Sequence, residues 1–308
     1  MIHKLLIGVS FHFAHQRLEY LKKVTCQFEN LSVCTKAFVV TNTKDKDEKN
    51  IIKDNIGDNI DIIVPNVIGH PYLLTWAHLD IFRQFFNKDR DITHFMYLED
   101  DIEIKPNNIK YWLNSRDELR ATGFYPSFVR YEYYKNKSKK MITDTSKVDL
   151  SFNQKLYLND LPSIKFKSLN YCYIGLPNPY QGMYLLDREL AKEHFFGVTS
   201  HPEFKIPWGI REKAAQGLTF SDFPQKGNNF KSRNLVKFYL DEAKIDPNSL
   251  IHHLPNNIAN NPKALGGKIP VKNLIIVNNG PYSLLYLMIK NKVKKVLKKI
   301  RLLLIHKG

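Results

Sequence analysis

Short apolar runs alternate with segments of helical periodicity along the first 110 residues, and this alternation constrains the fold more than any other feature. The apolar runs predict strands at Leu5–Phe11, Ala37–Thr41, Asp61–Val64 and His94–Leu98. The periodic segments predict helices at Arg17–Leu31 and Leu73–Phe86, with a polar loop at Asn42–Asn50. Strands that alternate with helices form a largely parallel sheet covered on both faces. We therefore expect an α/β fold, a Rossmann-like mixed sheet flanked by helices.

The pattern from about residue 110 to residue 270 is more mixed. We predict helices at Asn107–Leu119, Arg188–Phe196 and Ile210–Gln216, and strands at Ser127–Tyr133 and Gln181–Leu186. Two segments rich in charge or in Asn, Pro and Gly are expected to be loops: Lys135–Lys147 and Pro255–Pro270.

Positive charge gathers at the C-terminus of this chain, whose formal charge is +16. Residues 282–308 contain no acidic residue and eight basic ones: Lys290, Lys292, Lys294, Lys295, Lys298, Lys299, Arg301 and Lys307. Removing these eight from +16 leaves +8, spread rather than clustered, which favours anionic lipid or an anionic small substrate over nucleic acid. Apolar residues of the same segment share one helix face, from Leu285 to Leu303. We expect a C-terminal basic amphipathic helix on a membrane surface, with a helix docked on the domain as the alternative.

Cysteine usage and hydropathy bear on the compartment. Cys26, Cys34 and Cys172 lack metal-binding spacing and indicate a reducing compartment, and the first two are expected to fill core positions. The apolar start is shorter than a signal peptide requires, and we find no run of the roughly 18 apolar residues that span a membrane. The expected localisation is cytoplasmic, peripheral on the inner face of the cytoplasmic membrane.

Three adjacent acids follow the fourth predicted strand: Glu99, Asp100 and Asp101. Ligands of open α/β sheets bind at the carboxyl ends of the strands, so these carboxylates lie where a ligand is expected. Adjacent carboxylates repel one another unless a cation or solvent separates them. Mg²⁺ or Mn²⁺ suits oxygen ligands and commonly bridges to phosphate. A solvated turn is the plainer interpretation, which the apolar strand just before the acids makes weaker.

The stretch from Phe95 to Pro106, Phe-Met-Tyr-Leu-Glu-Asp-Asp-Ile-Glu-Ile-Lys-Pro, resembles the D-x-D segment of GT-A glycosyltransferases. Within that group it is most similar to the Glu-Asp-Asp-Leu-Glu-Val-x-Pro segment of the N-acetylglucosaminyltransferase I family. The resemblance implies a GT-A fold over 1–270, with a donor half of about 1–110 and an acceptor half of about 111–270, before a tail at 271–308. It implies that Asp101 binds the metal directly, while Glu99 and Asp100 hold ribose, sugar or metal-bound water.

Later segments extend the resemblance. Trp208-Gly209-Ile210-Arg211-Glu212 resembles a W-G-x-E-D element, although Arg-Glu stands where Glu-Asp is usual. An inverting transferase needs a carboxylate base, for which we expect Glu212, with Glu203 and Asp222 as substitutes, whereas a retaining one needs none. The resemblance implies that His252 or His253 completes the metal site or touches the diphosphate, with His253 slightly favoured. The donor nucleotide and sugar are expected to contact the ends of the first two strands and two nearby segments, at Ser10, Phe11, His12, Arg17, Thr41, Asn42, Trp76 and His78.

The function we expect is a metal-dependent glycosyltransferase. It would move a sugar from a nucleoside diphosphate sugar, UDP-linked by preference, to a hydroxyl of a glycan or glycolipid acceptor, in bacterial lipopolysaccharide or capsule synthesis. One rival is a sugar-nucleotide nucleotidyltransferase, which usually carries a Gly-rich loop where this chain reads Ser-Phe-His-Phe-Ala-His. The other is a basic membrane- or nucleic-acid-binding module; we expect no nucleic-acid partner.

Overall fold

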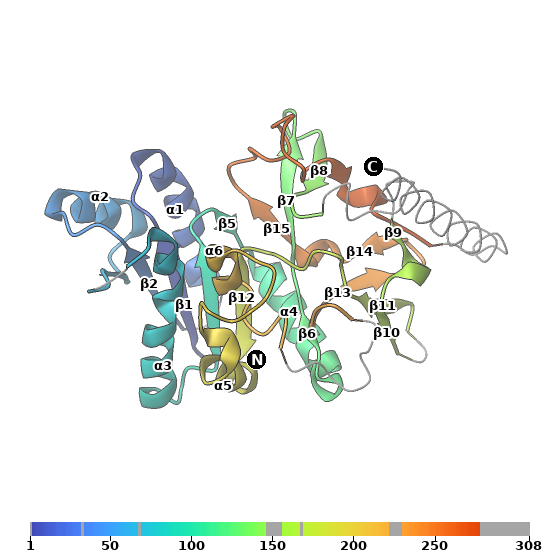
Figure 1. Ribbon diagram of the computed structural model, residues 1–308, viewed down its shortest axis with the longest axis horizontal. Coiled ribbons are helices and arrows are strands. Elements are labelled where there is room, and N and C mark those ends of the chain that lie inside the picture. Colours follow the sequence, from blue (N-terminus) through green and yellow to red (C-terminus); the bar gives the residue numbers. More distant parts are fainter. Residues whose placement is uncertain are drawn as a thin grey trace, which may run out of the picture.

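The computed structural model describes residues 2–31, 34–66, 69–145, 156–166, 169–221 and 230–277, which form mixed sheets flanked by helices (Figure 1). The predicted α/β class, a mixed sheet flanked by helices, is therefore confirmed. The predicted basic helix of the tail lies outside the described residues. Within those residues, no helix has both the length and the apolar character needed to cross a membrane.

The first sheet positions the three adjacent acids Glu99, Asp100 and Asp101, which we call the acidic run. Its five strands lie in the order β12-β4-β1-β2-β3. Four are mutually parallel and β12 runs antiparallel to β4. The parallel register sets Ser10 of β1 opposite Glu99 of β4, and Phe11 opposite Thr41 of β2. The strand bounds are β1 (Leu5–Phe11), β2 (Thr35–Thr41), β3 (Ile60–Ile63), β4 (His94–Glu99) and β12 (Met183–Asp187).

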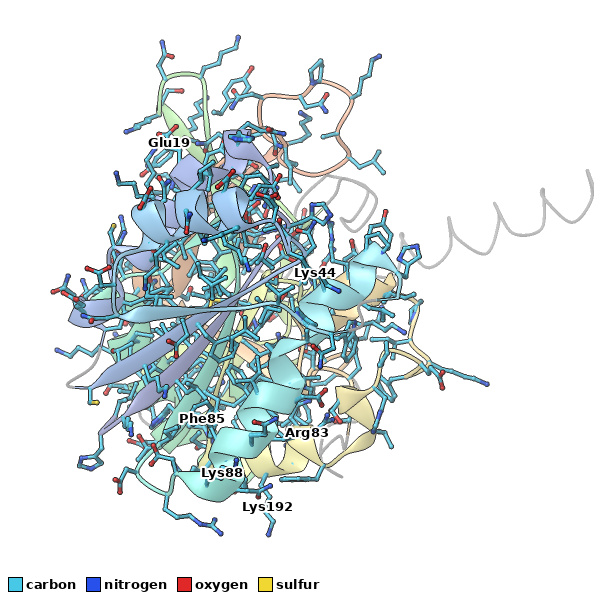
Figure 2. The ribbon with its side chains drawn as sticks, turned by 90° about the vertical axis from the view of Figure 1, so that its left-hand side faces the viewer. Glu19, Lys44, Arg83, Phe85, Lys88 and Lys192 are labelled. Atoms are coloured by element: carbon cyan, nitrogen blue, oxygen red, sulfur yellow. The ribbon has the colours of Figure 1, made fainter. Side chains whose placement is uncertain are left out.

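Helices cover both faces of this sheet. Successive side chains of β4 point to opposite faces: Phe95 packs against Phe82 of α3 and Phe195 of α5, whereas His94 packs against Trp112 of α4. Figure 2 shows α3, with Arg83 labelled, beside α5, and Arg83 Nε donates to the Phe195 carbonyl at 2.8 Å. The helices are α1 (Leu18–Thr25), α2 (Lys46–Ile56), α3 (His78–Lys88), α4 (Pro106–Leu119), α5 (Arg188–Phe195) and α6 (Ile210–Ala214).

Two further sheets lie above α4 and to its right in Figure 1. One has the order β16-β8-β7-β15-β5, with β5 (Ile102–Glu103), β7 (Val129–Tyr134), β8 (Lys139–Ile142), β15 (Leu250–His253) and β16 (Ile269–Pro270). The other has the order β10-β11-β13-β14, with β6 on β13; its strands are β6 (Tyr125–Pro126), β10 (Ser163–Lys165), β11 (Tyr171–Ile174), β13 (Asn234–Tyr239) and β14 (Lys244–Ile245). A short pair joins β9 (Leu156–Tyr157) to β17 (Ile275–Ile276).

Short 3-10 turns connect many of these elements. The two that carry site residues are η1 and η3, and one more, η8, leads into β15. Those within the described residues are η1 (His15–Arg17), η2 (Phe28–Asn30), η3 (Pro71–Trp76), η4 (Arg120–Thr122), η6 (Leu158–Asp160), η7 (Val198–Ser200), η8 (Pro247–Ser249) and η9 (Val271–Asn273).

Several local predictions are wrong. Residues 46–50, predicted as loop, begin α2, because the Asp45 side chain caps it by accepting from the backbone N–H groups of Asp47 and Glu48. The predicted loop at residues 135–147 contains β8, which forms a hairpin with β7. Cys26 and Cys34 are exposed rather than in the core.

Candidate active site

The acidic run begins at the last residue of β4 and packs against Gly182. Glu99 is the last residue of β4, and its N–H donates to the carbonyl of Gly182 at 3.0 Å. Gly182 has φ of 69°, and a Cβ there would lie 3.1 Å from the Ile102 side chain and 3.2 Å from Glu99 Oε2. Only glycine adopts this conformation readily and leaves that room. The close approach of the segment before β12 therefore helps to fix where the Glu99 carboxylate points.

Arg17 binds both aspartates of the run. Its Nε donates to Asp100 Oδ2 at 2.8 Å and its Nη2 to Asp100 Oδ1 at 2.5 Å and Asp101 Oδ2 at 2.9 Å. Burial raises the pKa of Asp100 to about 7, although Arg17 lowers it. The structure thus brings together Arg17, Asp100 and Asp101, three residues that the sequence analysis selected.

His253, at the end of β15, contacts Asp101 from the other side. Its Nε2 lies 3.4 Å from Asp101 Oδ2, and its Nδ1 lies 2.5 Å from Glu132 Oε1. Burial opposes the imidazolium, but the contacts with Asp101 and Glu132 raise the pKa of His253 to about 8. Burial likewise opposes the Asp101 carboxylate, yet His253 and Arg17 lower its pKa to about 2. Asp101 is therefore held as a buried anion between two cations.

Glu132 orients this histidine. Its carboxylate is fully buried, and Oε2 accepts from the backbone N–H groups of Ile258 at 2.8 Å and Ala259 at 2.5 Å. The same carboxylate consequently fixes the ring of His253 and the backbone that follows β15. Carboxylates that accept from the far nitrogen of a histidine are the usual orienting partners at metal sites.

A second buried network holds Glu99. The Tyr180 hydroxyl donates to Glu99 Oε1 at 2.6 Å, and Arg130 Nη1 lies 3.8 Å from Glu99 Oε2. Arg130 is itself paired with Asp144, through Nε at 3.0 Å and Nη2 at 2.6 Å. Burial raises the pKa of Glu99, and the charge of Asp101 adds to this. Both burial and the neighbouring anion Asp101 therefore disfavour the charged form of Glu99, while Arg130 and Tyr180 favour it.

The Trp208 segment forms a wall next to Glu99. The Trp208 ring is stacked on Tyr180, with centroids 5.9 Å apart and planes 18° apart. Trp76 Nε1 donates to the Ile210 carbonyl at 2.9 Å, which fastens α6 to η3. Within α6, Glu212 is partly exposed, and its Oε1 lies 3.0 Å from Arg211 Nη2. Burial lowers the pKa of Arg211, but the negative charge of Glu99 outweighs this and the pKa is raised. The structure therefore brings Arg211 into the electrostatic range of Glu99, with Glu212 beside it.

His252 points to the opposite face from His253, as consecutive strand residues do. Its ring is stacked on Tyr131 with centroids 5.2 Å apart, and Nδ1 lies 3.7 Å from Glu103 Oε2. That contact with His252 is the main reason why the pKa of Glu103 falls to about 2. Of the two histidines, the structure brings His253 alone into contact with Asp101.

The expected nucleotide-side residues at the ends of β1 and β2 differ in how exposed they are to solvent. Asn42 and Thr41 lie at the rim: Asn42 Oδ1 accepts from the Phe13 N–H at 2.8 Å, while the buried Thr41 hydroxyl has no hydrogen-bond partner among the described residues. Phe11 is fully buried and His12 is exposed. The Ser10 hydroxyl is buried against the Tyr97 hydroxyl at 2.8 Å.

Two other expected residues are not brought to the acidic run, and a third lies outside the described residues. His78 is completely buried, and its ring nitrogens contact the Thr75 carbonyl at 2.7 Å and the Tyr184 hydroxyl at 2.5 Å, so it belongs to the core. Glu203 is exposed, and no hydrogen bond or ion pair in the described part of the chain joins it to the run. Asp222 lies outside the described residues.

Sequence reasoning missed Arg130 and Glu132. Both lie in β7, two positions apart, and both are buried. Charged residues are almost never fully buried unless they are paired. The signal in the sequence was therefore a strand, Val-Arg-Tyr-Glu-Tyr-Tyr, with two charges on one face.

One oxygen of the run has no partner. Asp101 Oδ1 is buried and accepts no hydrogen bond from any residue that the structure describes. Within the same residues, no group of three or more His, Cys, Asp or Glu side chains is arranged to hold a metal ion. Among the described residues, Asp101 and its direct neighbours are the candidate protein ligands of a cation here.

No protein-family model and no curated protein matches the chain. Among solved structures it is similar to 4-diphosphocytidyl-2C-methyl-D-erythritol synthase from Anaerococcus prevotii, with a TM-score of 0.32 and 12% identity over 66% of this chain and 78% of that chain. It is also similar to residues 1–349 of S. aureus TarS, with a TM-score of 0.34 and 13% identity over 70% of this chain and 56% of that chain. Function is accordingly inferred from the side chains of the site.

Proposed function

We propose that this chain is a metal-dependent glycosyltransferase that uses a nucleoside diphosphate sugar. The observation that carries the proposal is Asp101: a buried carboxylate at the carboxyl end of a parallel sheet, with one oxygen unpartnered and cations on both sides. A buried oxygen that accepts no hydrogen bond lowers the stability of the fold by about 1–3 kcal/mol. The arrangement is explained if that oxygen binds a cation that arrives with the substrate.

The donor set fits Mg²⁺ or Mn²⁺. Such ions are commonly bound through one or two carboxylates, with substrate phosphates and water completing the shell, so two protein ligands are sufficient. Asp101 would be the carboxylate ligand, and His253, oriented by Glu132, would be the second candidate ligand once its Nε2 has released its proton. When bound, the ion would neutralise negative charge that develops on the departing diphosphate. Arg17, on the exposed side of both aspartates, would contact the same diphosphate.

The transfer breaks one bond and forms one. The oxygen of an acceptor hydroxyl bonds to the anomeric carbon of the donor sugar while the bond from that carbon to the diphosphate oxygen breaks, and its electron pair leaves with the nucleoside diphosphate. In an inverting reaction the hydroxyl proton passes to a carboxylate, for which Glu212 is our candidate. In a retaining reaction the proton passes to the departing phosphate. The Trp208–Tyr180 stack would form the wall against which the sugars lie.

We infer a glycan or glycolipid acceptor of bacterial lipopolysaccharide or capsule synthesis, and peripheral contact of the basic tail with the inner face of the cytoplasmic membrane. Deleting residues 282–308 tests the tail: a transferase keeps turnover on a soluble acceptor but loses binding to anionic vesicles, whereas a binding module loses its activity altogether.

Calorimetric titration of UDP and of the other nucleoside diphosphates, with and without Mn²⁺, tests the donor site. Wild type is compared with Asp101→Ala and with Asp54→Ala, an exposed aspartate of α2 that serves as the matched control. We expect metal-dependent binding to wild type and control that the Asp101 variant loses. If no nucleoside diphosphate binds in a metal-dependent way, the proposed function fails. If a nucleoside triphosphate and a sugar phosphate together release pyrophosphate, the chain is instead a nucleotidyltransferase.

A further inference from the structure

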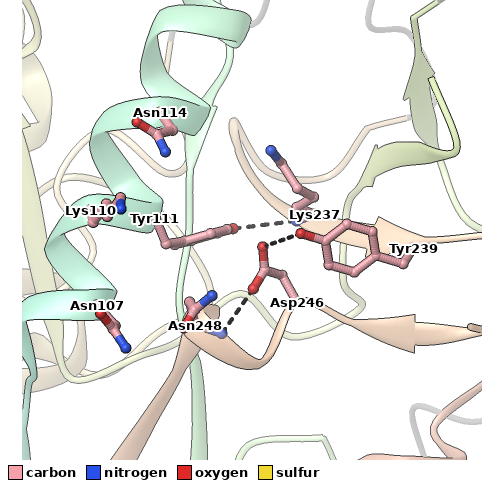
Figure 3. Close-up of a pocket in the computed structure, with 8 residues that line it drawn as sticks. All are labelled: Asn107, Lys110, Tyr111, Asn114, Lys237, Tyr239, Asp246 and Asn248. Carbon is pink, nitrogen blue, oxygen red and sulfur yellow. Dashed lines mark hydrogen bonds between the residues drawn. The ribbon is translucent and has the colours of Figure 1, made fainter. Parts of the chain in front are cut away.

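A polar groove of about 250 Å³ opens between α4 and β13, apart from the acidic run (Figure 3). One side is a stripe of exposed α4 residues, Asn107, Lys110 and Asn114, which share a helix face by their spacing of three and four. The other side consists of Lys237, Tyr239, Asp246 and Asn248, and Tyr111 lies between the two sides.

Internal hydrogen bonds fix Tyr111 and the β13 side of this groove. Asp246 accepts from the Tyr239 hydroxyl at 3.0 Å and from the Asn248 N–H at 2.9 Å, as Figure 3 shows. The Tyr111 hydroxyl donates to the Ser127 carbonyl at 3.1 Å and accepts from the Lys237 N–H at 3.3 Å. Because these bonds hold Tyr111, Tyr239 and Asp246 in place, the β13 side of the groove and the Tyr111 ring are preformed.

Its rim carries unused hydrogen-bonding groups. The side-chain amides of Asn107, Asn114 and Asn248 make no hydrogen bond with any residue that the structure describes. Each amide offers two donors and one acceptor oxygen. Three such groups around one groove, with a tyrosine ring held in place beside them, match a ligand that presents several hydroxyl groups and an apolar ring face.

The charges of the lining disfavour an anion. Lys237 Nζ is already paired with Glu118 at 3.1 Å and lies 4.2 Å from the centroid of the Tyr171 ring. Asp246 places a carboxylate in the wall, where it would repel a phosphate. Lys110 is the remaining cation, without an ion pair in the described structure. The volume is below the roughly 300 Å³ at which pockets for drug-sized ligands begin, which suits a single ring.

We propose that this groove binds one neutral sugar unit at a site separate from the donor site. Asn108 of α4 donates to the carbonyls of Asn248 and Leu250 at 2.7 and 3.0 Å, so α4 is tied to the start of β15, whose last residue is His253. Asn248 lies in η8, five residues before His253, so their Cα atoms are at most about 18 Å apart. This assignment rests on the proposed transferase function. The bound sugar unit would belong to the acceptor glycan, away from the hydroxyl that reacts.

Saturation-transfer NMR on the full chain tests the groove directly, with glucose, galactose and N-acetylglucosamine as separate probes. The variant Asn114→Ala/Asn248→Ala removes one amide from each side, and Asn87→Ala, an exposed asparagine of α3, is the matched control. We expect saturation of the ring protons of at least one sugar with wild type and control, reduced at least about five-fold in the double variant. Addition of UDP and Mg²⁺ should leave the signal unchanged.

Three outcomes would overturn the proposal: no transfer to any of the three sugars, equal transfer with the double variant, or loss of the signal when UDP and Mg²⁺ are added, which would place the sugar in the donor site. Failure of the groove proposal can be told apart from failure of the proposed function, because the latter is measured by metal-dependent nucleotide binding. A double variant that binds nucleotide normally but no longer binds sugar supports the groove alone.

Discussion

Replacing Glu132 by Gln tests whether the buried carboxylate organises the site. The carboxylate accepts three hydrogen bonds, from His253 Nδ1 and from the N–H groups of Ile258 and Ala259. Glutamine keeps one carbonyl oxygen, but its NH₂ group must then face either the ring N–H or the two backbone N–H groups. A hydrogen bond to a charged group contributes about 1.5–3 kcal/mol, and breaking a buried ion pair costs about 3–5 kcal/mol.

We therefore expect the free energy of unfolding of Glu132→Gln to fall by about 3 kcal/mol. A domain of this size loses roughly 2–4 °C of melting temperature per kcal/mol, so the expected decrease is about 6–12 °C. Thermal unfolding followed by circular dichroism measures it, with Glu29→Gln, an exposed glutamate, as the control. The affinity for UDP with Mg²⁺ should fall about 10- to 100-fold, as for other orienting partners of metal ligands. A Glu132 variant that melts within about 1 °C of the control would refute the reasoning.

Three further variants probe other parts of the fold. Gly182→Ala places a Cβ 3.1 Å from Ile102 at a φ of 69°, and should lower the free energy of unfolding by about 1–3 kcal/mol in urea titrations; no change would mean that the segment adapts. Burial lowers the pKa of His194 to about 3, so the unfolded chain takes up a proton at this residue first as the pH falls below about 6.5, and that part of the stability is lost toward acid pH. The stability difference between wild type and His194→Gln should accordingly shrink by about 1.4 kcal/mol from pH 7.5 to pH 5.5, and a difference independent of pH would contradict the assignment. Trp76→Phe loses the bond to the Ile210 carbonyl and should expose α6 to faster hydrogen exchange, with unchanged exchange counting against a fastening role.

Local pattern was sufficient for much of the first sheet. The apolar run that ends in Glu99 identified β4 and the place of the acids, because a buried strand and the residue that follows it are neighbours in sequence. The helix α2 was missed because only two of its residues, Ile52 and Ile56, are buried, which leaves little periodicity. The Asp45-x-x-Glu48 cap was the available signal.

The residues that contact these acids could not be predicted from local sequence pattern. Arg17 comes from the beginning of the described chain and His253 from near its end, and local periodicity carries no information on which distant side chains will meet. His253 was favoured over His252 from a resemblance, but the physical reason is strand geometry: adjacent residues of β15 point to opposite faces. Glu132 could be found only as a charge in an apolar strand, with its partner unknown.

The antiparallel strand β12 has a consequence for how the protein is made. It comes from the second half of the chain, yet it covers the edge of β4 in the first sheet, and the residue before it, Gly182, receives the Glu99 N–H. During synthesis, the ribosome therefore releases the acidic run long before the strand that covers β4. An unpaired apolar edge invites association with other chains. We expect nascent chains that end before residue 183 to need protection by chaperones, and the first 110 residues expressed alone to aggregate rather than to bind nucleotide.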